Sequence, residues 1–155
     1  MKHSDLTVDR GIQMMNKTYS QMIAIPKFED RYAYLKLNGK VGEDTFGHSR
    51  YLNQSFYKSR AWKDFRDYII IRDNGCDLAS QDRPIPHRIY IHHINPITEQ
   101  DILERNDILL DPENAVCVSF DTHQAIHYGD ESLLRLDPIE RKPFDTCPWR
   151  LNDGS

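Results

Sequence analysis

Five residues between positions 91 and 129 have side chains that could build one metal site: His92, His93, Asn114, His123 and His127. Neutral imidazole nitrogens bind divalent transition metals, and three of them can hold one ion while leaving positions open for water. An open position distinguishes a catalytic ion from a structural one. A fourth imidazole beside the ion can take a proton from water, because its ordinary pKa of about 6.5 lies near neutral pH. The stretch therefore predicts one divalent-metal site with a general base.

No single pair of these residues predicts a metal site, and the prediction depends on all five together. His123 and His127 are four residues apart, which places both imidazoles on one face of a helix. Such pairs also occur by chance on surface helices. His92 and His93 are adjacent and would point to opposite faces of a strand, so both can serve one site only if the strand ends there. Asn114 can bond to the backbone near His93, although taken alone it is equally a turn residue after a proline.

Three elements must position these side chains. Residues 88–92 and 114–119 are rich in β-branched residues and predict two strands. The acidic segment between them predicts a loop with a short helix over 99–105. Asp121 is a suitable N-cap for a final helix that carries the two spaced histidines, and Gly129 is suited to end it.

The rest of the chain predicts helices that precede this unit. Thr18 and Pro26 bound a short helix over 19–25, a second follows over 28–37, and a longer helix is expected over 55–72. Residues 39–50 predict a loop and residues 76–87 a turn-rich connection. The expected organisation is a flexible arm at 1–17, an N-terminal helical region at 18–54, a core at 55–130 and a C-terminal wrap at 131–155.

The long predicted helix has an apolar and a basic side. Phe56, Trp62, Phe65 and Ile69 form an apolar stripe, and we expect Trp62 to be a core residue. The net charge of −4 disfavours a nucleic-acid partner for the chain as a whole. However, six anions between Glu99 and Glu113 outweigh the cations of this helix in the net charge. The cations that we expect to contact phosphate, if a nucleic acid binds, are Lys58, Arg60, Lys63, Arg66 and, on the first strand, Arg88.

Length and composition narrow the class of protein. A chain of 155 residues predicts one domain with its own core. It has no apolar run long enough for a membrane span and no apolar segment near its N-terminus, so we expect neither a membrane anchor nor a signal peptide. Its three cysteines form no CxxC pair, which favours a reducing compartment over a disulfide framework.

The order of paired histidines, asparagine and His-x3-His resembles the HNH, or ββα-metal, endonuclease family, and is especially similar to the nuclease domains of the colicin DNases. Residues 56–78 (FYKSRAWKDFRDYIIIRDNGCDL) resemble the helix before the motif in phage-encoded HNH nucleases. With YLKLNGKVG at 34–42 and TFGHSRYLNQ at 45–54, most of the chain from Thr18 onward resembles that phage group.

The resemblance implies an α+β fold: a ββα-metal core of a two-stranded hairpin plus a helix, with N-terminal helices packed on it. It makes His92, His123 and His127 the ligands of one divalent ion (Mg, Mn, Ni, Co or Zn), with His93 as general base and Asn114 as the middle residue of the motif. It implies hydrolysis of double-stranded DNA in the cytoplasm of a bacterial host. Phage packaging proteins would be further partners by family analogy.

The chain departs from the family pattern at two places. Many members pin the hairpin with a zinc ribbon of two CxxC pairs, but here only Cys76 matches, and Ala79, Ser119 and Thr122 occupy the other positions. The colicin enzymes have a carboxylate two residues before the paired histidines, where this chain has Tyr90. We therefore expect no ribbon zinc, and an acidic partner for the site must come from elsewhere.

Two other functions remain as alternatives. A non-catalytic module that binds nucleic acid or protein would use all four histidines as a closed structural site, with His93 as a ligand. A toxin nuclease of the colicin type would need translocation domains and an immunity partner, and this short acidic chain is a poor fit for it. The role of His93 separates the first alternative from a nuclease.

Overall fold

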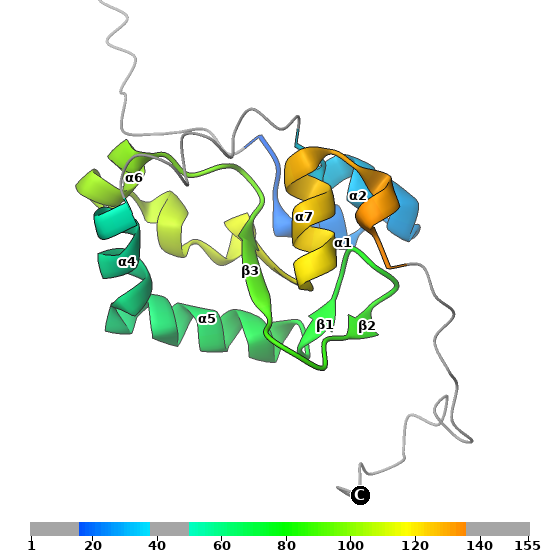
Figure 1. The fold of residues 1–155 in the computed structure, drawn as a ribbon, viewed down its shortest axis with the longest axis horizontal. Helices are drawn as coiled ribbons and strands as arrows, with labels where there is room; N and C mark the ends of the chain where they lie inside the picture. Colours follow the sequence, from blue (N-terminus) through cyan, green and yellow to red (C-terminus); the bar gives the residue numbers. More distant parts are fainter. Residues whose placement is uncertain (1–15, 38–49, 136–155) are drawn as a thin grey trace, which may run out of the picture.

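The structure, a computed structural model, describes residues 16–37 and 50–135 (Figure 1). The α-helices are α1 (Tyr19–Ile23), α2 (Phe28–Leu35), α4 (Arg50–Lys58), α5 (Arg60–Arg72), α6 (Glu99–Glu104) and α7 (Phe120–Tyr128); the strands are β1 (Cys76–Asp77), β2 (Arg83–Pro84), β3 (Tyr90–His93) and β4 (Ala115–Val118). This mixture of helices and strands agrees with the predicted α+β class. The predicted arm, the loop at 39–50 and the C-terminal wrap lie mostly outside the described residues. None of the described helices is long and apolar enough to cross a membrane.

The two N-terminal helices pack against α7. As predicted, Thr18 caps α1 through its side-chain oxygen. In α2, Tyr32 and Leu35 are buried, and the Tyr32 hydroxyl donates to the Ala125 carbonyl of α7 at 2.9 Å. The backbone N–H of Leu37 donates to a second α7 carbonyl at 2.9 Å. These contacts hold α7 in place through the carbonyls of Ala125 and Ile126.

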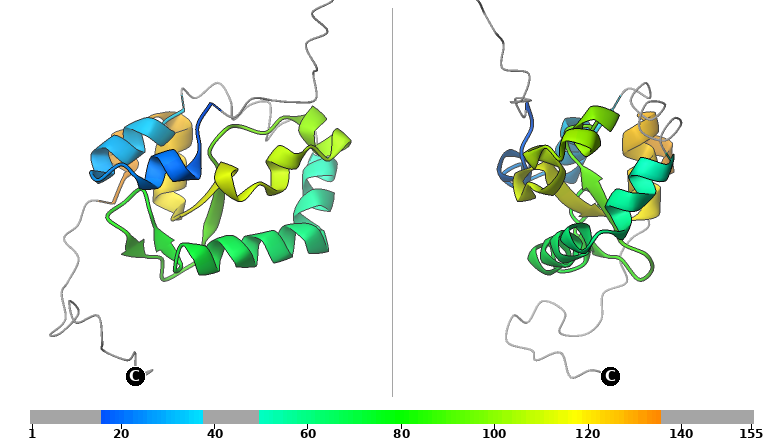
Figure 2. Two further views of the ribbon diagram at one scale, coloured as in Figure 1. Left: turned by 180° about the vertical axis from the view of Figure 1, so that it is seen from behind. Right: turned by 90° about the vertical axis from the view of Figure 1, so that its left-hand side faces the viewer.

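The helix predicted over 55–72 is two helices, which corrects the sequence-based prediction. α4 and α5 meet at a corner on Ser59 (Figure 2). The Ser59 hydroxyl accepts from the Trp62 backbone N–H at 3.2 Å and donates to the Phe56 carbonyl at 2.6 Å, so this residue caps one helix and closes the other. Trp62 is only 7% exposed, which confirms it as a core residue.

The two predicted strands pair as an antiparallel hairpin. β3 and β4 align His92 with Val116 and His93 with Ala115. All four residues of β4 are buried, because its two faces pack against different helices. The even residues, with Val116, join the cluster around α2 and α7, while the odd residues, with Ala115, join the cluster around α5.

The N-cap of the last helix lies two residues before the one that the sequence predicted. Ser119, not Asp121, is the N-cap of α7, and its side chain accepts from the Thr122 backbone N–H at 3.2 Å. Asp121 lies inside the first turn, where its charge favours the positive end of the helix dipole. Gly129 ends α7 as predicted: its φ is +66°, and a Cβ there would lie 2.8 Å from the Leu37 carbonyl oxygen.

A small hairpin of β1 and β2 lies within the predicted turn-rich connection, and its Asp77 ties it to α7. One Asp77 carboxylate oxygen accepts from the Ser119 N–H at 3.0 Å and from the Thr122 hydroxyl at 2.5 Å, and the other accepts from the Ala79 N–H at 3.2 Å. Ala79, Ser119 and Thr122 are the positions at which the expected resemblance to zinc-ribbon proteins lacked cysteines. In this chain the buried Asp77 carboxylate links these three residues.

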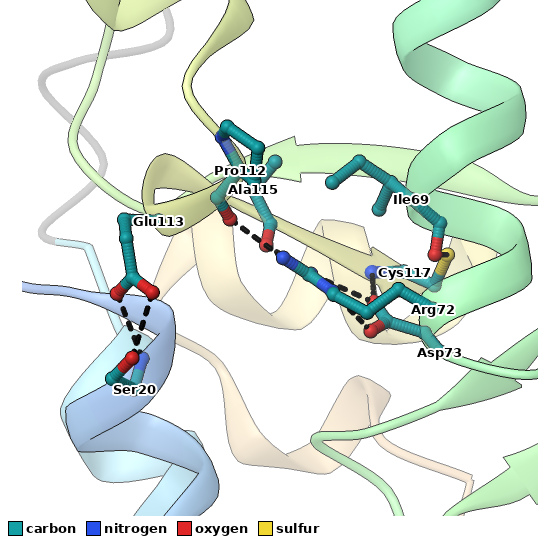
Figure 3. A network of polar contacts seen from close by, with 8 residues as sticks. All are labelled: Ser20, Ile69, Arg72, Asp73, Pro112, Glu113, Ala115 and Cys117. Carbon is teal, nitrogen blue, oxygen red and sulfur yellow. Dashed lines mark hydrogen bonds and ion pairs between the residues drawn. The ribbon is translucent and has the colours of Figure 1, made fainter.

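A second buried carboxylate joins α5 to β4 (Figure 3). Asp73 accepts from the Cys117 backbone N–H at 2.9 Å and pairs with the Arg72 guanidinium at 2.8 Å. Arg72 donates in turn to the carbonyls of Pro112 and Ala115, each at 2.6 Å. Because these bonds reach the residues just before and within β4, they fix the strand that pairs with the histidine-bearing β3.

We expect Asp77→Ala to lower the free energy of unfolding by about 2–4 kcal/mol, because it leaves buried donors without an acceptor. Asp64→Ala is the matched control: Asp64 is exposed and forms only an i,i+4 pair with Arg60, so its removal should cost less than about 0.5 kcal/mol. Urea unfolding followed by circular dichroism measures both values. Equal stabilities of the two variants would contradict the structural role of Asp77.

Candidate metal centre

Three of the predicted ligands converge in the structure. His92 from β3 and His123 and His127 from α7 have ligand atoms that all lie within 4.8 Å of one another. In the described part of the chain no other group of histidine, cysteine or acidic side chains meets this condition. The spacing of four residues brings the His123 and His127 Nε2 atoms to 3.0 Å, and β3 supplies His92 because it packs against α7.

The donor atoms of this group fit a divalent ion. Two nitrogens that bind one zinc ion at about 2.0–2.1 Å lie about 3.0–3.4 Å apart, close to the observed His123–His127 separation. His92 is 1% exposed, and its buried Nε2 has no hydrogen-bond partner among the described residues. A buried polar atom without a partner is costly, and an ion would satisfy it. We take these observations as evidence that the group can hold one ion.

The electrostatics keep all three imidazoles neutral. Burial holds the pKa of His92 well below its ordinary value, and the neighbouring His123 and His127 lower it further. Burial and the neighbouring His127 lower the pKa of His123 to about 4. Burial also lowers the pKa of His127. Only neutral imidazole binds a metal, so the site is ready for one at neutral pH.

Tyr90 supports the group from one side. Its ring stacks on His123, with ring centroids 5.3 Å apart and an angle of 29° between the planes. Tyr90 stands two residues before His92, at the position that carries a carboxylate in the colicin enzymes. The contact therefore orients a ligand by packing instead of by charge. Sequence reasoning missed this role, although the alternation of residues along β3 places Tyr90 and His92 on one face.

His93 lies on the opposite face of the hairpin and is not part of the three-histidine group. Its ring packs against Trp62, with centroids 5.6 Å apart, and its Nε2 is 3.0 Å from the Leu109 carbonyl oxygen. A carbonyl only accepts, so Nε2 carries the proton and Nδ1 is left as the acceptor. Burial lowers the pKa of His93, while the Leu109 carbonyl and the Asp101 carboxylate oppose that shift. The Leu109 carbonyl thus orients a neutral His93 ring.

Asn114 holds the connection between the two strands. Its amide oxygen accepts from the Asn95 backbone N–H at 2.7 Å, and its amide nitrogen donates to the Ile108 carbonyl at 3.2 Å. The predicted bond to backbone near His93 is confirmed. Asn114 is fully buried, so it acts by positioning the loop and does not reach a substrate.

Asp101 is the acidic residue that the sequence pattern did not reveal. Its carboxylate accepts from the Thr98 backbone N–H at 2.7 Å and from the Asn106 side-chain nitrogen at 2.9 Å. The Asn106 carbonyl then accepts from the Leu109 N–H at 3.1 Å. This chain of bonds fixes the carbonyl that orients His93. The capping box formed by Thr98 and Asp101 was the available sequence signal.

The predicted phosphate contacts divide into two groups. Lys58, Arg60 and Lys63 are exposed, although Arg60 pairs with an aspartate one turn on. Arg66 is partly buried and donates to the Ile89 carbonyl at 3.1 Å, so it also supports the strand. Arg88 is exposed, and its guanidinium lies 5.3 Å from the centre of the Tyr90 ring. Arg88 is thus connected to the histidine group through the Tyr90 ring, which stacks on His123.

Comparison with known proteins does not supply a family. No family model, curated protein or solved structure matches the chain. The histidine group, the separate His93 and their supports are therefore the observations from which a function can be inferred.

We expect zinc, nickel or cobalt ions to raise the melting temperature of the protein. An ion at a hundredfold excess over its dissociation constant adds about 2.7 kcal/mol, which corresponds to several degrees. His123→Ala and His127→Ala should abolish the shift, and His87→Ala, a change at an exposed histidine, should retain it. Differential scanning fluorimetry measures the shifts. A shift that survives in His123→Ala and His127→Ala would place the ion elsewhere.

We expect the metal-free protein to lose stability as the pH falls from about 6.5 toward 4. The folded-state pKa values of the three histidines are lowered, so the unfolded chain, with histidine pKa values of about 6.5, binds more protons in this window. The contribution of these histidines to the free energy of unfolding is therefore fully present above about pH 6.5 and is lost as the pH falls toward 4. His123→Asn should reduce the pH dependence of the melting temperature in EDTA, and His87→Asn should not. Parallel curves for wild type and His123→Asn would contradict the assignment.

Proposed function

We propose that this chain is a metal-dependent DNA endonuclease or nickase of the HNH, or ββα-metal, type. The observation that carries the proposal is the convergence of three histidines next to a fourth, His93, at which β3 ends. Three neutral imidazoles converge on the α7 side, and His93 stays outside that group on the α5 side. A phage or prophage origin, action in the bacterial cytoplasm and contact with packaging proteins are the parts of this proposal that rest on family resemblance alone.

The ion-binding group supplies the first half of the chemistry. His92, His123 and His127 would hold a divalent ion, which when bound supplies Lewis-acid stabilisation of charge on the scissile phosphate and the leaving oxygen. Three protein ligands leave positions for water and phosphate. Imidazole ligands favour Zn, Ni, Co or Mn by ligand softness, and a site with many waters also accepts Mg.

His93 supplies the second half. Its Nε2–H donates to the Leu109 carbonyl, which fixes the tautomer and directs the lone pair on Nδ1 to act as base. Nδ1 takes a proton from the attacking water, whose oxygen bonds to phosphorus as the bond to the 3′ oxygen breaks. The products carry 5′-phosphate and 3′-hydroxyl ends. A neutral His93 at pH 7 is the state that this step requires, and its lowered pKa provides it.

A binding module with a structural ion is the competing function. It requires His93 to close the ion's shell as a fourth ligand. His93 instead hydrogen-bonds to a loop carbonyl and packs on Trp62, which favours the role of base. The exposed cations on α4 and α5 are available to bind the phosphates of a DNA duplex under either function.

We expect the wild-type protein to nick supercoiled plasmid with at least one of Mg, Mn, Co, Ni and Zn, and EDTA to stop the reaction. His93→Ala should lower the rate by about 100- to 10,000-fold, the usual effect of losing a general base. His93→Gln fills the buried space and separates lost chemistry from lost packing. Both variants should bind the ion with wild-type affinity in calorimetric titrations, because His93 is not a ligand.

Tyr68→Ala alters an exposed aromatic residue on α5 and should leave the nicking rate unchanged. If no metal supports nicking and both His93 variants lose the ion, His93 is a fourth ligand. The nuclease proposal would then be wrong, and the protein would be a binding module.

A further inference from the structure

A cavity of about 290 Å³ lies next to the histidine group, on the side of Tyr90. Its walls come from β1–β2, the residues before β3, and the N-terminal turn of α7. Two aromatic rings, Tyr90 and Phe120, line it with centroids 5.7 Å apart. Tyr90 also stacks on His123, so the cavity is one aromatic ring away from an ion ligand. Phe120 remains 52% exposed, although it is a large apolar side chain at the start of the site's own helix.

The rim of this cavity is mainly cationic. Arg83, Arg88 and Arg135 line it, with His87 beside them. The two acidic side chains at the cavity are Asp77 and Asp121. The Asp77 carboxylate is already bound by the backbone and hydroxyl donors that tie it to α7, whereas the guanidinium of the exposed Arg88 lies against the Tyr90 ring. Aromatic walls with a guanidinium rim suit a flat base attached to a phosphate.

We propose that this cavity binds one unpaired nucleotide of the DNA strand that the protein cleaves, with the base against Phe120 and its phosphate at Arg88. This inference rests on the proposed nuclease function and adds a substrate class to it. In an intact duplex every base is stacked and paired, so a base can enter a cavity only where the strand is single, frayed or gapped. The expected substrates are therefore single-stranded, flapped or gapped DNA, in preference to continuous duplex.

The position of the cavity supports a site for substrate instead of a separate ligand. Phe120 and His123 are three residues apart on α7 and share a face of the helix. A strand that places one phosphate at the histidine group can thus place an adjoining nucleotide in the cavity. A free mononucleotide is the other source of the same chemistry, and a competition experiment separates the two.

Binding to metal-free protein tests the inference without depending on cleavage. The probes are a fluorescein-labelled oligothymidylate and a blunt duplex of the same length, titrated in EDTA and followed by fluorescence anisotropy. We expect tighter binding of the single strand. Phe120→Ala should weaken that binding by at least about fivefold, since base–aromatic stacking is worth about 1–3 kcal/mol, and should leave duplex binding unchanged. Arg88→Gln should weaken it and reduce its dependence on salt.

Tyr68→Ala is the matched control, because Tyr68 is an equally exposed aromatic residue, 56% against 52%, on a helix that does not line the cavity. It should bind both probes as wild type does. Circular dichroism melts check that Phe120→Ala is folded. Phe120→Leu keeps an apolar side chain without an aromatic face and should bind the single strand as weakly as Phe120→Ala.

Two results would overturn the nucleotide site: unchanged single-strand binding by folded Phe120→Ala, or competition by thymidine monophosphate at the same nucleotide concentration, which would indicate a free nucleotide. Plasmid nicking distinguishes failure of this inference from failure of the nuclease proposal. If nicking occurs and Phe120 does not affect binding, only the nucleotide site is wrong. If Phe120 governs single-strand binding but no ion supports cleavage of either the plasmid or the single-stranded oligonucleotide, the nucleotide site stands and the nuclease proposal is wrong.

Discussion

The register between β3 and β4 is the constraint on which the site depends. Pairing His92 with Val116 and His93 with Ala115 sends the two adjacent histidines to opposite faces of the hairpin. Because β4 is buried on both faces, between α7 on one side and α5 on the other, each histidine enters a different packed layer. A slip of β3 by one residue would exchange the faces that the two histidines occupy. The separation of the proposed ion ligand from the proposed base is therefore a consequence of strand pairing.

Burying the histidine group costs folding free energy, and the contacts of two buried carboxylates offset this cost. His92 keeps a buried nitrogen without a partner, and clustered imidazoles resist protonation. Asp77 fixes the start of α7 to the β1–β2 hairpin, and Asp73 with Arg72 fixes β4 to the end of α5 (Figure 3). Both carboxylates accept from backbone N–H groups, so their charge is satisfied where it is buried. The helices around the hairpin thereby keep the histidines in a geometry that their own contacts would not select.

The supports of the two proposed roles are separate, which has a chemical advantage. The ligand His123 is oriented by the stacked ring of Tyr90, whereas His93 is oriented by a loop carbonyl that Asp101 and Asn106 hold. A change in the loop between the strands would therefore alter the base without altering ion binding. The side of the site beyond Tyr90 is lined by aromatic and cationic side chains and offers room for substrate beside the proposed ligands. The proposed ligand His92 and the proposed base His93 lie on opposite faces of the two-stranded hairpin.

The sequence by itself determined the local pieces: the His-x3-His face of α7, both strands, the Thr18 cap and Gly129 at the helix end, because these depend on periodicity and on backbone preferences of single residues. It failed where two local signals compete, since Ser59 breaks a continuous amphipathic pattern and Ser119 caps α7 in place of Asp121. Only the tertiary structure decided that Asp77 links Ser119 and Thr122 to the β1–β2 hairpin and that Tyr90 supports His123. The contacts of Asp77 and Tyr90 join residues far apart in the chain, and their strength comes from shared burial, which no pattern of neighbouring residues encodes.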